Sequence, residues 1–125
     1  MQTAATFLEA LTEHLDAIAS RDIDRFAATL ARDDVRFVGG DGRIIEGREN
    51  VIAAHRGWFS SDAWRFEPEL LWTREEPGAG WALTRVTYIE GRTHKQFLLL
   101  FLFVNEEDAW RLVYDQNTPI AASES

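Results

Sequence analysis

The feature that most constrains the fold is an uninterrupted run of eight apolar residues, Phe97 to Val104. The run has neither helical nor alternating periodicity. It is rich in aromatic residues and is followed by a polar turn, which is typical of a strand buried on both faces. It is too short to cross a bilayer as a helix, which takes about 20 residues. The turn at residues 105–108 leads into a second apolar segment, Trp110 to Asn117, so we expect an antiparallel hairpin.

Burying both faces of an antiparallel strand requires a layer on each side, because such a strand usually leaves one face to water. Helices of the same chain can cover one face. We expect a second copy of the chain to cover the other. The apolar run at Phe97–Val104 therefore predicts a homodimer that forms through the sheet containing it.

Composition limits the classes of protein to which the chain can belong. Its 125 residues predict a single domain over residues 1–125, with a core at about 3–118 and a loose C-terminal tail. The net charge of −8 and the lack of a basic stripe argue against nucleic acid or an anionic membrane as partner. The chain has no cysteine, and its first residues lack the features of a signal peptide, so we expect a cytoplasmic protein without disulfides.

Hydrophobic spacing predicts three helices followed by long strands, which is the α+β pattern. Residues 3–20 carry an apolar stripe at helical spacing that includes His14. Asp22 is the expected N-cap of a short second helix, and residues 47–59 form the third. Because Pro68 has no amide donor, its strand is an edge strand or has a bulge there. The predicted strands are 35–38, 43–46, 64–75, 81–90, 93–104 and 110–117.

This order of elements, together with three segments, resembles the nuclear transport factor 2-like superfamily and its SnoaL-like branch. The segments are Asp33–Phe37, Ile45–Ile52 and Trp110–Gln116. The resemblance implies a cone-shaped, curved antiparallel or mixed sheet wrapped around three helices from the N-terminal half. It also implies a pocket inside the cone and dimerisation through the outer face of the sheet. Members include isomerases, dehydratases, cyclases, epoxide hydrolases and binding or assembly domains, so the fold alone does not fix the function.

Asp115 is the first candidate for catalysis because it interrupts a strongly apolar segment. Alternation places Asp115 and Asn117 on one face of the last strand, and Leu112 and Tyr114 on the opposite face. A partly buried carboxyl there would have a raised pKa and would suit a general base, the part that an aspartate plays in SnoaL-like cyclases. The alternative is that Asp115 pairs with an arginine at the pocket mouth or faces water.

Two histidines complete the candidate catalytic set. By resemblance, His14 takes the place of the oxyanion-binding tyrosine of ketosteroid isomerases. The alternative is a histidine satisfied by one hydrogen bond between helices. His55 can face the sheet and form a proton-transfer pair with Asp115, whose carboxylate would fix the ring tautomer. No acid stands at Val38–Gly39, where the isomerases carry their catalytic aspartate, and this departure argues against isomerase chemistry.

Five further residues are candidates for ligand binding. Arg85 would hold a ligand carboxylate in bidentate fashion, or else form an outer-face ion pair with Glu69 or Glu75. Asn117 would orient the ligand. The many aromatic residues favour a roomy apolar pocket, with the core and a dimer interface as alternative places for them. The aromatic candidates are Trp58, Phe59 and Tyr114.

The sequence predicts a pocket protein for a small apolar molecule that needs neither a metal nor a cofactor. The three histidines lack metal-site spacing, and no nucleotide-binding loop or serine-nucleophile motif is present. The expected chemistry is isomerisation, cyclisation or dehydration by proton transfer. Asp115 would be the base, and His14 or His55 would be the acid or oxyanion donor. The alternative is a non-catalytic dimerisation or ligand-sensing domain.

Overall fold

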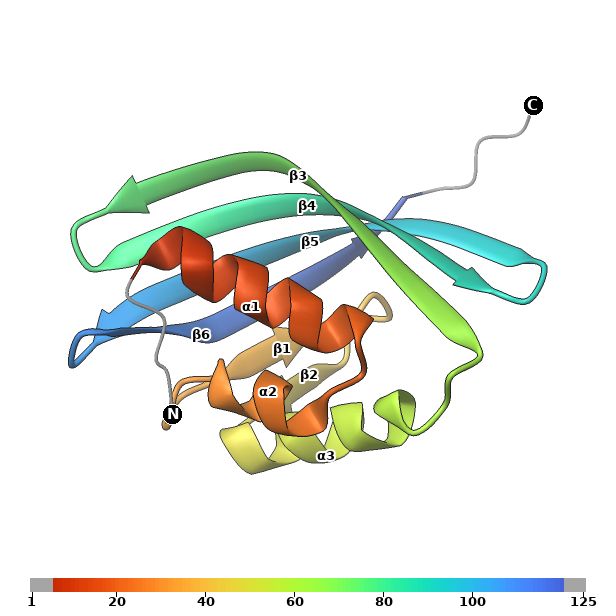
Figure 1. The fold of residues 1–125 in the computed structure, drawn as a ribbon, viewed down its shortest axis with the longest axis horizontal. Coiled ribbons are helices and arrows are strands. Elements are labelled where there is room, and N and C mark those ends of the chain that lie inside the picture. Colours follow the sequence, from red (N-terminus) through yellow and green to blue (C-terminus); the bar gives the residue numbers. More distant parts are fainter. Residues whose placement is uncertain (1–5, 121–125) are drawn as a thin grey trace.

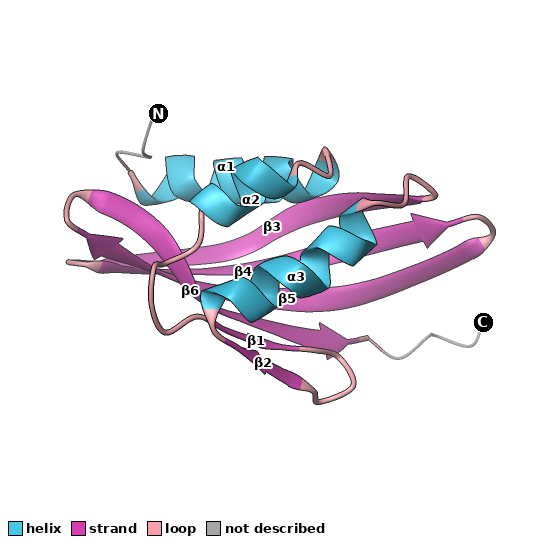
Figure 2. Ribbon diagram, turned by 90° about the horizontal axis from the view of Figure 1, so that it is seen from below, coloured by secondary structure: helices cyan, strands magenta, loops and turns pink. Residues whose placement is uncertain are grey.

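The computed structural model describes residues 6–120, in which a curved six-stranded sheet wraps around three helices. All three helices lie on the concave side of the sheet (Figures 1 and 2). The helices are α1 (Phe7–Ala19), α2 (Ile23–Ala28) and α3 (Arg48–Phe59). The strands are β1 (Arg36–Val38), β2 (Ile44–Glu46), β3 (Trp64–Glu76), β4 (Ala79–Glu90), β5 (Thr93–Glu106) and β6 (Ala109–Pro119). The α+β cone predicted from the sequence is confirmed.

The helices begin where the sequence supplies a cap. The Thr6 side chain accepts a hydrogen bond from the backbone N–H of Glu9, so α1 begins at Phe7, later than predicted. Asp22 caps α2 as predicted, by accepting from the N–H of Arg25. Gly47, with a φ of 93°, precedes α3 in a conformation that favours glycine. The predicted first residues of α1, 3–5, lie outside the described part of the chain.

The sheet is mixed, with the strand order β2-β1-β6-β5-β4-β3. The short strand β1 pairs with β6 in parallel, whereas the other neighbouring strands are antiparallel. β3 is an edge strand, which is where the missing amide donor of Pro68 is tolerated. Its register shift falls further along, between Leu70 and Trp72. β6 continues to Pro119, so the strand extends beyond its predicted end at Asn117.

β5 buries one face fully and the other only in part. Leu99, Phe101 and Phe103 are buried against the helices. Leu98, Leu100, Leu102 and Val104 alternate with them and are half-buried on the convex side. The strand is therefore doubly apolar, as predicted, but within one chain the helices cover only its concave face.

A register shift in β6 decides which residues share a face with Asp115. Tyr114 lies opposite Leu102, and Leu112 lies opposite Phe103, so Val113 has no partner in the ladder. Both Leu112 and Asp115 are consequently buried on the concave side. The predicted placement of Leu112 on the opposite face is wrong, because strict alternation takes no account of such a bulge.

The concave side is filled with side chains at the end where α1 begins. The Phe7 ring packs 5.7 Å, centroid to centroid, from both Phe103 and Trp110. Gly80 makes this approach possible, because a Cβ there would lie 2.5 Å from the Phe7 ring. The opposite end is not filled in this way, and the candidate site lies there.

Candidate functional site

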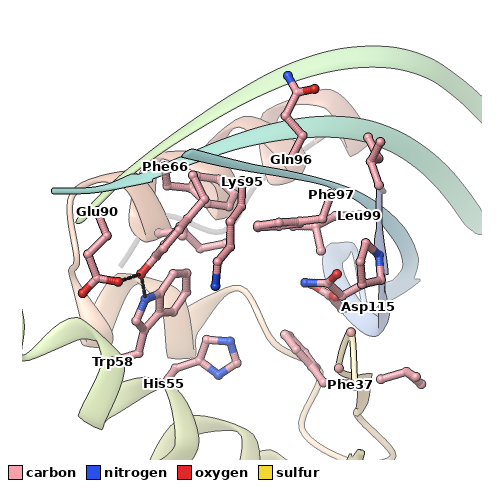
Figure 3. A pocket seen from close by; sticks show the side chains of 18 of the residues that line it. Phe37, His55, Trp58, Phe66, Glu90, Lys95, Gln96, Phe97, Leu99 and Asp115 are labelled. Carbon is pink, nitrogen blue, oxygen red and sulfur yellow. Dashed lines mark hydrogen bonds between the residues drawn. The ribbon is translucent and has the colours of Figure 1, made fainter. Parts of the chain in front are cut away.

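A cavity of about 1070 Å³ lies inside the cone, between the concave face of the sheet and α3. Its size is at the upper end for small-molecule sites, which span roughly 300–1,000 Å³. All six strands, together with α1 and α3, contribute residues to its walls. The apolar walls include Phe37, Trp58, Phe66, Phe97 and Leu99, and the polar groups include His55, Asp115 and Asn117 (Figure 3).

Asp115 presents a desolvated carboxyl to this cavity. In the sheet, Asp115 lies between Phe101 of β5 and Phe37 of β1, and Asp115 is only 5% exposed. Within residues 6–120, its carboxyl makes no hydrogen bond or ion pair. Burial disfavours the charged form and raises the pKa of Asp115 to about 8. The side chain is therefore mostly protonated and neutral at pH 7.

His55 presents a lone pair rather than a proton to the cavity. Its Nδ1 lies 2.8 Å from the carbonyl oxygen of Val51, one helical turn earlier. Because a carbonyl only accepts, Nδ1 carries the hydrogen and Nε2 carries the lone pair. Burial lowers the pKa of His55, although the bond to Val51 opposes that shift. Val51 thus fixes the tautomer, and the prediction that Asp115 would do so is wrong.

Phe37 connects the walls that carry the two groups. Its ring packs edge-on against His55 at 5.0 Å, and its backbone pairs with Asp115 in the parallel ladder between β1 and β6. In Figure 3, His55 and Asp115 face the cavity from two sides, with Phe37 between them. A ligand that covers Phe37 can therefore meet a proton donor on one side and a proton acceptor on the other.

His14 is sealed beneath the site and does not line the cavity. It is 0% exposed, and its Nδ1 lies 2.7 Å from Thr29 Oγ1. The Thr29 hydroxyl donates to the carbonyl of Phe26, so His14 Nδ1 is the donor to Thr29. Desolvation, aided by nearby His55, lowers the pKa of His14 to about 3. This placement matches the alternative of a histidine held by one hydrogen bond between helices.

The predicted ligand-binding residues divide between the cavity and other places. Trp58 and Asn117 line the cavity. Phe59 follows Trp58 by one helical position and turns into the core instead. Arg85 forms an ion pair with Glu69 at 3.1 Å, which was the alternative prediction for it. Tyr114 lies on the convex face and donates to Gln116, so Phe59, Arg85 and Tyr114 are not part of the cavity wall.

Several lining residues were not predicted from the sequence, among them Phe37, Tyr88, Lys95 and Leu99. The signal for Lys95 was present, since counting back in twos from Leu99 reaches it. Because the apolar run was predicted to be buried on both faces, the sequence did not indicate which of its residues face the helices. The Tyr88 hydroxyl accepts from the indole N–H of Trp58 at 3.2 Å, a contact between distant elements that spacing along the chain does not reveal.

The comparison with known families identifies the fold family. Residues 8–121 match the SnoaL-like domain. The chain belongs to the SnoaL-like domain family. No curated protein matches this SnoaL-like domain.

Solved structures share the fold at low sequence identity. A candidate calcium/calmodulin-dependent protein kinase type II association domain from Thiobacillus denitrificans ATCC 25259 matches with a TM-score of 0.85 at 22% identity, over 96% of this chain and 99% of that one. A candidate dehydratase of the nuclear transport factor 2-like family from Streptomyces avermitilis matches with a TM-score of 0.77 at 13% identity, over 90% of this chain and 93% of that one. An LEH-like epoxide hydrolase of M. tuberculosis matches with a TM-score of 0.69 at 19% identity, over 89% of this chain and 80% of that one. These likenesses establish the fold and leave the activity open.

Over residues 6–120, this SnoaL-like domain has no helix with the length and apolar character needed to span a membrane. The same stretch contains no cluster of three or more His, Asp or Glu side chains arranged to hold a metal ion.

Proposed function

We propose that this SnoaL-like domain binds a small apolar molecule in its cavity and catalyses cofactor-free proton transfer on it. The observation that carries the proposal is Asp115, a buried carboxyl that faces the cavity and has no hydrogen-bond partner among residues 6–120. An unpaired buried carboxyl destabilises a fold. Such costs are characteristic of functional sites, where activity requires a locally unfavourable group.

We assign the two roles in the opposite sense to that expected from the sequence, and the directions of the two pKa shifts support this assignment. Asp115, with its pKa raised to about 8, is the proton donor at neutral pH. His55, neutral and with its lone pair on Nε2, is the proton acceptor. Nε2 removes a proton from a carbon next to a carbonyl while Asp115 gives its proton to the carbonyl oxygen. Transfer of the proton from His55 to a different carbon of the conjugated enol, while the Asp115 carboxylate takes back the proton of the enol oxygen, completes an isomerisation and restores both side chains.

The same pair of groups serves the other reactions expected from the sequence. In a dehydration, His55 takes the carbon-bound proton and Asp115 protonates the departing hydroxyl, which leaves as water. In a cyclisation, the carbanion formed by proton removal attacks a second carbonyl, whose oxygen takes the proton of Asp115. Two similar folds named as a dehydratase and an epoxide hydrolase support this class of chemistry by analogy of fold.

The test uses a flat, apolar ketone, 2-tetralone, and follows exchange of its α-protons for deuterium in D₂O by ¹H NMR. We expect the wild-type protein to accelerate exchange above the buffer rate. Asp115→Asn and His55→Gln should each lower the enzyme-dependent rate at least about tenfold. Arg85→Gln, on the convex face, is the matched control and should keep the full rate. Exchange no faster than in buffer, or exchange indifferent to both cavity variants, would contradict the proposal.

The convex face favours a second role, homodimerisation. Leu98, Leu100 and Leu102 project from it in a row and are only half-buried within one chain. Trp72 on β3, 48% exposed, adds to this apolar surface, because it lies in line with Leu83 of β4 and Leu100 of β5 across the sheet. Burial of such a surface against a second copy is the expected outcome of the hydrophobic effect. A similar fold named as an association domain is compatible with this role.

Dimerisation is tested by light scattering at micromolar concentration. The wild-type protein should have the mass of a dimer. Leu100→Glu should have the mass of a monomer, because it would bury two carboxylates at the interface. Ala54→Glu, at an exposed position of α3 on the other side of the sheet, is the control and should remain dimeric. If the wild-type protein has the mass of a monomer, the dimerisation role is wrong, and the proton-transfer proposal is unaffected.

A further inference from the structure

Lys95 is unusual both in its identity and in its place. It is the sole lysine of the chain, whose 13 basic residues are otherwise all arginine. It is also one of the two oppositely charged side chains, with Glu90, that line the cavity near the hairpin between β4 and β5. The single lysine therefore lies where it can contact a molecule bound in the cavity.

The register of the sheet directs Lys95 to the concave side. It belongs to the same alternating set on β5 as Phe97 and Leu99, both of which line the cavity. Its partner across the ladder is Tyr88, whose ring packs against Trp58 on α3. Figure 3 shows the Lys95 side chain extending into the cavity on the same side as the Phe97 ring.

The ammonium group of Lys95 is available to a ligand. Among residues 6–120, each ion pair uses an arginine, and no carboxylate lies within 4.0 Å of the Lys95 amine. Glu90 also lines the cavity, and its carboxylate accepts a hydrogen bond from the Tyr88 hydroxyl at 3.4 Å. Lys95 is exposed, so its charge remains hydrated until an anion displaces the water.

We propose that the cavity takes an amphiphilic monocarboxylate, a specification of the ligand that rests on the proposed function. Its carboxylate pairs with Lys95 at the open end of the cavity. Its apolar body lies against Phe37, Phe97 and Leu99. An oxygen in the body, a carbonyl or a hydroxyl, reaches the Asp115 carboxyl on the far wall.

Charge makes this ligand class more specific than apolar walls alone. The chain has a net charge of −8, so its overall field repels an anion. A cation at the mouth offsets that repulsion locally and orients the molecule with its acid group outward. A lysine suits this task because its long stem follows the apolar wall while its ammonium remains at the water boundary. A neutral apolar ligand would gain nothing from Lys95, and this difference can be measured.

The test compares decanoate with 1-decanol, two molecules with equal chain length that differ in charge. Each is titrated as a competitor that displaces the fluorescent neutral probe N-phenyl-1-naphthylamine from the protein. The variants are Lys95→Met, which keeps the stem and removes the charge, and Lys95→Arg, which keeps the charge. Arg92→Met is the matched control, because it removes one positive charge from the adjacent turn without changing a residue of the cavity wall.

We expect Lys95→Met to weaken decanoate binding roughly three- to tenfold and to leave 1-decanol unchanged. Lys95→Arg should retain most of the decanoate affinity, and Arg92→Met should retain all of it. If Lys95→Met changes decanoate and 1-decanol equally, or changes neither, the monocarboxylate proposal is overturned while the apolar cavity stands. If wild type binds neither competitor and does not bind the probe, both this proposal and the proposed function fail.

Discussion

The surroundings of the ionisable groups differ between the two ends of the concave side. At the packed end, Phe103 and its neighbours fill the space, and His14 is sealed with its Nδ1 on Thr29. At the other end, the cavity leaves His55 and Asp115 facing free volume. Phe26 lies between the two ends, with its ring centroid 5.2 Å from that of His14 and 4.4 Å from that of His55.

A shifted pKa alone therefore does not mark a functional site. Desolvation is the main cause of both shifts, lowering the pKa of His14 to about 3 and raising that of Asp115 to about 8, in the direction that favours the neutral form of each. Only Asp115 combines the shift with a surface that a ligand can reach. The sealed histidine is thus a structural group, and the accessible pair is the candidate for chemistry.

The largest expected effect is on the pH dependence of stability. The folded-state pKa of Asp115 lies above its unfolded value, so between about pH 4 and 8 the native state holds a proton that the unfolded state releases. The free energy of unfolding of the wild type should therefore fall relative to Asp115→Asn as pH rises through that window, by at most about 5 kcal/mol. Urea denaturation of both proteins at pH 4.5, 6.5 and 8.5, roughly spanning the window, measures the difference. A difference independent of pH would show that Asp115 is ionised in the native state.

The next effect distinguishes the sealed end from the cavity. His14→Ala should destabilise the fold by about 2–4 kcal/mol, because it leaves a void among fully buried rings. The same variant should bind N-phenyl-1-naphthylamine with unchanged affinity, since His14 does not line the cavity. Denaturation and probe titration are read on the same preparation. A marked loss of probe binding in a folded His14→Ala protein would place His14 in the site.

His55→Ala should show the reverse pattern. Its ring is only half-buried and borders free volume, so the loss of stability should be near 1 kcal/mol, smaller than for His14→Ala. Exchange of the 2-tetralone α-protons should decrease strongly, because the proton acceptor is gone. His55→Gln, which restores bulk without a comparable base, should recover stability and leave exchange low. Recovery of exchange in His55→Gln would argue that the residue only shapes the wall.

The smallest effect is expected on the convex face. The ion pair between Arg85 and Glu69 is largely exposed, with side chains 42% and 66% accessible. Arg85→Gln should therefore change the free energy of unfolding by less than about 1 kcal/mol and leave probe binding unchanged. Reduced binding of decanoate by this variant would revive the carboxylate-binding role first expected for Arg85.

The fold was predictable because its main signals are local. Caps such as Asp22, the proline at position 68 and the apolar run of β5 each act within a few residues of chain. The family resemblance then supplied the arrangement in space. The cavity wall was harder to predict, because it brings together residues such as Phe37 and Lys95 from opposite parts of the chain.

The errors at the site have the same physical origin. A bulge at Val113 moved Leu112 to the inner face, and spacing does not reveal a bulge. The tautomer of His55 depends on a backbone carbonyl, that of Val51, which every residue type offers. Asp115 was found because its residue type is itself unusual in an apolar strand, whereas its role as donor depends on a degree of burial that only the folded chain defines.

The most direct test of the account is the titration of the Asp115 carboxyl by ¹³C NMR, in protein labelled at the aspartate carboxyl carbon and assigned with Asp115→Asn. We expect a midpoint of about 8, so that the carboxyl is protonated and able to donate at neutral pH. A midpoint near 4, the ordinary range for an aspartate, would mean an ionised, hydrated side chain. That result would contradict both the assignment of Asp115 as proton donor and the proposed chemistry.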